Sequence, residues 1–154
     1  PRVWLVNKVE ILPAVVGLPA LIAGDVDPRD RALLEKSIPE GSTLSGDPFG
    51  WTANIEVYSP TEIQVGVKTS DRSILVLGDV FYPGWKARVD GQEKVVFPIN
   101  YLFRGVFVEP GEHLVVFSYE PGSFEAGWRI SLISALGITL LAGFGLWKAW
   151  PDPS

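Results

Sequence analysis

The chain of 154 residues has no cysteine, no methionine and a single histidine. Without cysteine there is no disulfide, thiolate nucleophile or cysteine metal site, and one histidine rules out a metal site built on a histidine pair. The sequence also lacks a nucleophile elbow, a glycine-rich phosphate loop and a dinucleotide fingerprint. Its formal net charge of −5 argues against nucleic acid as a partner. We therefore expect no catalytic, cofactor or metal site.

One long apolar stretch is present near the C-terminus. The 18 residues 130–147 carry no charge. As a helix they would be about 27 Å long, close to the hydrocarbon thickness of a bilayer. A helix apolar on every face would need more surrounding structure than residues 1–127 offer in a soluble protein. Its flanking charges and indoles fit the membrane interface, so the predicted anchors are Trp128, Arg129, Trp147, Lys148 and Trp150.

The sequence thus predicts three parts: a domain over residues 1–127, a transmembrane helix over 128–150 and a short tail over 151–154. The short tail is the more natural cytoplasmic side. We expect the domain on the periplasmic or extracellular side of a bacterial cytoplasmic membrane.

Small residues recur every four positions along the predicted membrane helix. They are Ser131, Ala135, Thr139 and Gly143. Such a stripe lets the backbone of another membrane helix approach closely. We expect this face to dock on integral membrane subunits as well as to lie in the lipid bilayer.

The middle of the chain alternates apolar and polar residues with the two-residue period of half-buried strands. Turn signals recur between these segments, among them Asp90-Gly91, which is typical of a two-residue hairpin turn. The pattern predicts a mainly β fold: an antiparallel β-sandwich or jelly-roll-like domain followed by one C-terminal transmembrane α-helix. In the N-terminal third we expect a strand over residues 3–12, a short helix over 18–23 that covers the sheet, a strand over 32–35 and a loop over 37–50.

Several segments together resemble a known family: residues 1–6, 27–29, 77–87, 89–91, 100–106 and 110–113. The most specific is Tyr-Pro-Gly-Trp at 82–85, followed by Asp90-Gly91. In this order they resemble the C-terminal extracytoplasmic domain and final transmembrane helix of YfhO-like bacterial membrane proteins. Those proteins are related to the GT-C glycosyltransferases, which use lipid-linked sugar donors.

The resemblance implies the fold, export and membrane attachment, but not glycosyl transfer. The family carries its catalytic acidic residues in loops between many upstream membrane helices, which this sequence does not contain. The chain is then either a fragment of a larger polytopic protein or a separate subunit that reuses the domain.

Four side-chain groups invite functional interpretations. His113 is the single histidine and lies beside a turn, which is typical of a surface histidine rather than a catalytic base. The pair Asp79 and Asp90 would suit glycoside hydrolysis, although such aspartates are common at turns. The acidic segment 25–30 suits calcium, or is a solvated loop. Finally, four aromatic residues form a candidate ligand or partner surface, or fill the core: Trp51, Tyr82, Trp85 and Tyr101.

These observations leave three hypotheses. The first is a non-catalytic single-span accessory subunit that docks in and stabilises a larger bacterial membrane complex, respiratory or photosynthetic. The second is a sugar- or lipid-sugar-binding domain of a GT-C type glycosyltransferase, with a glycan as partner. The third is a hydrolase that uses Asp79 and Asp90. The first hypothesis is the principal expectation.

Overall fold

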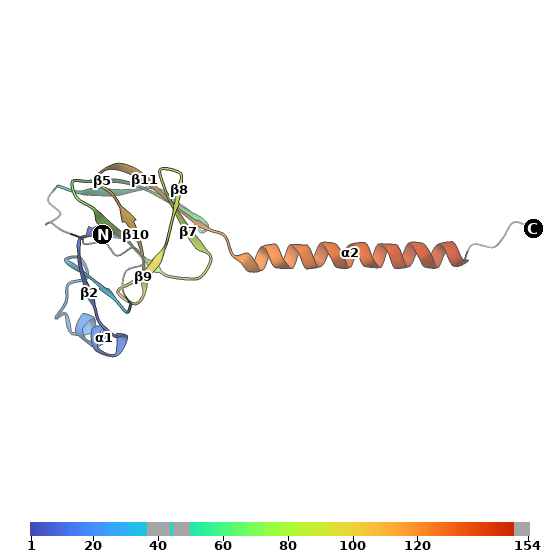
Figure 1. Ribbon diagram of the computed structural model, residues 1–154, viewed down its shortest axis with the longest axis horizontal. Helices are drawn as coiled ribbons and strands as arrows, with labels where there is room; N and C mark the ends of the chain where they lie inside the picture. The colour runs from blue at the N-terminus through green and yellow to red at the C-terminus, as the bar shows by residue number, and fades with distance from the viewer. Residues whose placement is uncertain (37–43, 45–49, 150–154) are drawn as a thin grey trace, which may run out of the picture. The chain divides into compact units, whose positions relative to one another are not determined.

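The computed structural model describes residues 1–36, 44 and 50–149. Within the last helix it describes the side chains of residues 122, 127, 128 and 130–142. The chain divides into two units, Pro1–Glu120 and Pro121–Ser154. The first unit holds eleven strands and one helix among the described residues, and the second holds a helix (Figure 1).

Two antiparallel sheets form the main body of the first unit. One has four strands in the order β1-β6-β10-β9, and the other has five in the order β4-β5-β11-β7-β8. The strands of the first sheet are β1 (Val3–Val6), β6 (Ser73–Val80), β10 (Phe103–Val108) and β9 (Phe97–Ile99). Those of the second are β4 (Thr52–Tyr58), β5 (Glu62–Thr69), β11 (Gly111–Tyr119), β7 (Trp85–Val89) and β8 (Gln92–Lys94).

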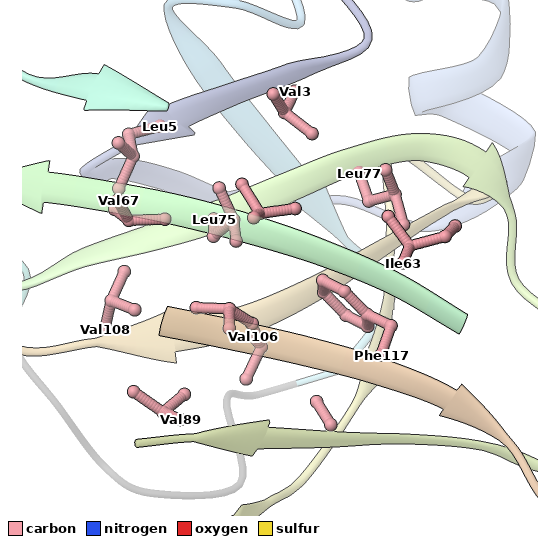
Figure 2. Packing of buried hydrophobic residues seen from close by; sticks show 13 residues of the cluster. Val3, Leu5, Ile63, Val67, Leu75, Leu77, Val89, Val106, Val108 and Phe117 are labelled. Carbon is pink, nitrogen blue, oxygen red and sulfur yellow. The ribbon is translucent and has the colours of Figure 1, made fainter. Parts of the chain in front are cut away.

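The principal core lies between these two sheets. In Figure 2, Leu75 and Val106 of the four-stranded sheet face the same interior as Ile63 and Phe117 of the five-stranded sheet. All four side chains are at most 1% exposed. The expected antiparallel sandwich is therefore confirmed, since alternate residues of both sheets point inward.

A second core covers the opposite face of the four-stranded sheet. Strands β2 (Lys8–Ile11) and β3 (Arg31–Leu34) pair in parallel, which the sequence did not predict. Ala32 and Leu34 of β3 pack with Val6 and Ile74 of the sheet. Because both of its faces are buried, β6 reads in the sequence as a continuous apolar run rather than an alternating one.

The helix α1 (Ala14–Ala23) differs from the expected covering helix. Among its residues only Gly17 is buried, while Val15 and Ile22 are more than 80% exposed. The prediction that it covers the sheet was wrong, because β2 and β3 already occupy that face. Gly24 ends the helix with φ of 80°, and its amide bonds the carbonyls of the last turn.

The predicted N-terminal strand is also divided. β1 ends at Val6 and β2 begins at Lys8, so the chain leaves the four-stranded sheet between them and enters the β2–β3 pair. The predicted hairpin at Asp90-Gly91 is confirmed: both residues have positive φ, and β7 pairs with β8. The predicted loop over 37–50 lies almost entirely outside the described residues.

The second unit contains helix α2 (Gly122–Ala149), which begins earlier than the predicted boundary at residue 128. Within the part of the chain that the structure describes, no helix combines the length and hydropathy needed to cross a membrane.

Candidate functional site

A break in the pairing of β6 with β10 creates the most distinctive polar site. Arg104 pairs with Leu77, whereas the preceding Phe103 pairs with Val80. Gly78 and Asp79 are therefore left without a partner in β10, as in a β-bulge. The amide of Gly78 instead donates to the carbonyl of Arg2, at 2.8 Å. Bulges of this kind redirect a side chain, and this one presents Asp79 to Arg104.

Arg104 points into the sandwich rather than toward solvent. It shares a face of β10 with Val106 and Val108, which belong to the principal core. Its side chain is only 5% exposed. The guanidinium carbon lies 3.8 Å from the ring centroid of Trp85, a cation–π contact between the two sheets.

Asp79 gathers several donors at this point. Its Oδ1 accepts from Nε of Arg2 at 3.2 Å, and its Oδ2 accepts from the hydroxyl of Tyr58 at 3.1 Å. Nη2 of Arg104 lies 3.5 Å from the same Oδ2. Burial lowers the pKa of Arg104, and the charge of Asp79 partly offsets this effect. The guanidinium stays protonated at physiological pH, because its ordinary pKa is far above that range.

The polar groups line a cavity of about 400 Å³. Its wall combines two charged side chains and two hydroxyl-bearing residues with an apolar remainder. The lining residues are Tyr58, Ser59, Pro60, Ile63, Asp79, Val80, Trp85 and Arg104. A cavity of this size with a few convergent polar groups suits a small ligand.

The four predicted aromatic residues do not form one platform. Tyr82 is exposed and lies with Trp85 around Tyr119, with ring centroids 6.4 and 5.4 Å from that of Tyr119. Trp51 packs against both cores. The hydroxyl of Tyr101 donates to the carbonyl of Leu12, which fastens the segment before α1. Of the predicted set, only Trp85 lines the cavity.

Asp79 and Asp90 also have separate partners. Oδ2 of Asp90 lies 2.6 Å from Nδ1 of His113, and its Oδ1 accepts from the amide of Leu114. The side chain of His113 is 16% exposed, so it is more enclosed than the predicted surface histidine. The hydrogen bond to Asp90 raises the pKa of His113. Each aspartate thus orders its own turn or bulge, and the two do not share a hydrogen-bond network.

The acidic segment 25–30 makes ordinary loop contacts. Asp27 accepts from the amide of Arg29, and Asp30 pairs with Lys8. Across the described residues, no group of three or more acidic, histidine or cysteine side chains is placed to hold a metal ion.

Helix α2 exposes its apolar side chains on all sides. Every described residue from 127 to 142 is exposed, including the predicted docking residues Ser131, Ala135 and Thr139 and the anchor Trp128. The hydroxyls of Ser134 and Thr139 donate to the carbonyls four residues earlier, at 2.9 and 2.8 Å. The predicted residues Arg129, Gly143, Trp147 and Lys148 have side chains outside the described set, and Trp150 lies outside the described residues.

Arg104 is the site residue that the sequence analysis missed. Its signal was present: in a strand with a two-residue period, it occupies a position in phase with Val106 and Val108. Comparison with known proteins adds no identification, because no family model, curated protein or solved structure matches the chain.

Proposed function

We propose that this protein is a non-catalytic accessory subunit that docks in a larger bacterial membrane complex through α2. The observation that carries the proposal is the exposed apolar surface of α2. Leu132, Ile138 and Leu140 are 49–74% exposed and point in different directions around the helix. An apolar helix of this kind needs lipid or other helices around it.

Two further features of α2 suit an apolar surrounding. The hydroxyls of Ser134 and Thr139 are already bonded to the helix backbone, so these two groups need no water. The uncharged stretch of sequence also runs on to residue 147, beyond the last described side chain. In the proposal α2 is the predicted membrane segment, and the β domain lies on the periplasmic or extracellular side.

The first unit offers a second surface for the same complex. Val15, Val16 and Ile22 of α1 are 53–84% exposed, and Ile11 before the helix is 55% exposed. No charge occurs between Glu10 and Asp25. Several exposed apolar side chains in one uncharged segment are typical of a protein contact. In the proposal it braces the domain against an extramembrane part of the complex.

The small-residue stripe gives the sharpest test. Ala135→Leu fills the stripe and is expected to release the chain from its partners in mild detergent, because helix backbones no longer approach closely. Gly137→Leu is the matched control: two residues along a helix place it about 200° away, and nothing lies within 4 Å of its Cβ position. Native purification followed by mass spectrometry measures the partners retained by each variant.

Retention of the same partners by both variants would exclude this face, and a monodisperse full chain in detergent-free buffer would exclude membrane docking altogether. A separate pair tests α1. Ile22→Ser is expected to weaken copurification, whereas Val95→Ser, at a residue 57% exposed on another part of the domain, is expected to leave it unchanged.

One observation favours the alternative that the domain binds a sugar. Tyr82 presents an exposed ring close to Tyr119 and Trp85, near residues that line the cavity. Binding of neutral oligosaccharides that Tyr82→Ala abolishes would favour a glycan-binding domain over a structural subunit.

A further inference from the structure

A buried guanidinium with unused donors stands out among the polar groups of the first unit. Nε and Nη1 of Arg104 are buried and have no hydrogen-bond partner among the described residues. Its Nη2 reaches Asp79 only at 3.5 Å, which is long for a charge-assisted hydrogen bond. A buried unpaired donor is costly, and more so on a charged group. Packing with the principal core alone does not explain this arrangement.

The charges around the cavity do not balance. Two guanidiniums, from Arg2 and Arg104, converge on the single carboxylate of Asp79. The site therefore carries one formal positive charge in excess. The guanidinium carbon of Arg2 also lies 4.4 Å from the ring centroid of Tyr58, a residue that lines the cavity. A ligand that completes the site would carry one negative charge.

The geometry favours a carboxylate over a phosphate. A guanidinium fork matches the two oxygens of a carboxylate, and one such group brings the excess charge to zero. A phosphate dianion would be repelled by Asp79, whose side chain is 14% exposed and poorly screened. The remaining wall, made of Pro60, Ile63, Val80 and the Trp85 ring, suits an apolar or ring-shaped body.

We infer that the cavity between Arg104, Asp79 and Tyr58 binds a small monocarboxylate, with the carboxylate held by Arg104 and the body against the apolar wall. This site lies within the first unit and does not depend on the membrane contacts proposed for α2. Loss of membrane partners and loss of carboxylate binding are therefore separable results.

Isothermal titration calorimetry of the full chain in detergent tests the inference with benzoate and glucuronate as probes. Their neutral counterparts, benzamide and methyl glucoside, control for the body of the ligand. Each carboxylate is expected to bind at least about 10-fold more tightly than its neutral counterpart. Inorganic phosphate is expected to bind more weakly than benzoate.

Two variants separate a binding site from a structural ion pair. Asp79→Asn removes the internal competitor for Arg104, so benzoate affinity is expected to rise about 3- to 10-fold. Asp25→Asn changes the net charge equally at an exposed position and is expected to leave affinity unchanged. Arg104→Met is expected to abolish binding, with circular dichroism as the check on folding. Should that variant unfold, the Asp79→Asn result decides alone.

The inference is overturned if neither carboxylate binds, or if benzamide binds as well as benzoate. It is equally overturned if Asp79→Asn leaves affinity unchanged or lowers it, or if phosphate binds more tightly than both carboxylates.

Discussion

The two units of the chain differ in how far their apolar side chains are buried. The sandwich of the first unit buries Phe117, Leu75 and their neighbours completely between two sheets. The described part of α2 leaves Leu140 and Leu141 about three-quarters exposed. Each such side chain forgoes about 1.5–3 kcal/mol that burial would supply. The sandwich is stabilised by burial of its own apolar side chains, whereas the described apolar side chains of α2 gain no such burial.

The same contrast holds for small residues. In the first unit Gly17 lies directly against the ring of Tyr101, so its lack of a side chain is a packing requirement. In α2, Gly127 and Gly137 have nothing within 4 Å of a Cβ position. In the proposed function, small residues there let another membrane helix approach closely.

A large-to-small pair of substitutions should separate the units most clearly. Phe117→Ala is expected to lower the free energy of unfolding by about 3–5 kcal/mol, because it opens a cavity in the principal core. Leu140→Ala removes a side chain that is 74% exposed and is expected to change it by less than about 0.5 kcal/mol. Denaturant titration of the full chain in detergent, followed by tryptophan fluorescence, measures both. Equal effects would contradict the contrast between the units.

Asn100 should show the next largest effect. The backbone amide of Asn100 donates to the carbonyl of Leu33 at 2.8 Å. The side-chain Oδ1 of Asn100 accepts from the backbone amide of Leu33 at 2.7 Å. Asn100→Ala leaves that buried amide without an acceptor and places alanine at a φ of 50°. We expect a loss of about 1–3 kcal/mol in the free energy of unfolding.

The exposed Asn54 offers the matched control for this substitution. Asn54→Ala should be nearly neutral, and hydrogen exchange should show faster exchange of the Leu33 amide only in the Asn100 variant. Undiminished protection of that amide would show that Asn100 does not hold β3.

The sequence predicted the sandwich well because its strands obey local rules. In β5, inward residues such as Val65 alternate with outward ones, and the positive φ values at Asp90-Gly91 follow from the turn type. The continuous apolar run of β6 is likewise a local feature of the sequence, and it reflects two buried faces. These features depend on residues close together in the sequence, so they can be predicted without knowing the long-range contacts.

The sequence could not predict features that depend on long-range pairing. The parallel pairing of β2 with β3 and the clamp between Asn100 and Leu33 join segments far apart in the chain. The cavity depends on a bulge in β6 that brings Asp79 to Arg104 and on Trp85 from the other sheet. The aromatic residues were chosen by type alone, so Trp51 and Tyr101 were grouped with Trp85 although they serve different contacts.

Substitution of glycine by alanine should affect stability differently in the two units, with a smaller difference than the substitutions above. Gly17→Ala is expected to cost about 1–3 kcal/mol, because the new methyl group overlaps the phenol of Tyr101 and displaces it. Gly127→Ala in α2 is expected to leave the stability of the sandwich unchanged and to raise helix propensity by about 1 kcal/mol. Thermal denaturation followed by circular dichroism compares them. A neutral Gly17→Ala would mean that Tyr101 moves without losing its bond to Leu12.

The smallest expected effect comes from pH at the β7–β8 hairpin. The hydrogen bond to Asp90 raises the pKa of His113 above 6.5, so the protonated form is favoured by folding. Its contribution to stability is complete below 6.5 and is lost as pH rises through the raised value. The same bond lowers the pKa of Asp90 below 3.8, so that contribution is present above 3.8 and is lost on further acidification.

The two shifts together predict that the pair contributes constant stability at mildly acidic pH. That contribution is then lost as the pH becomes alkaline. Because Asp90 is 51% exposed, water screens the pair and the change should be modest. We expect the melting temperature of the full chain to fall between about pH 6 and about pH 9. His113→Gln should flatten this decline, because it removes the titrating group while keeping a polar side chain of similar length. Since α2 has no counterpart to this pair among its described side chains, a decline that persists in His113→Gln would assign the pH dependence to another part of the sandwich.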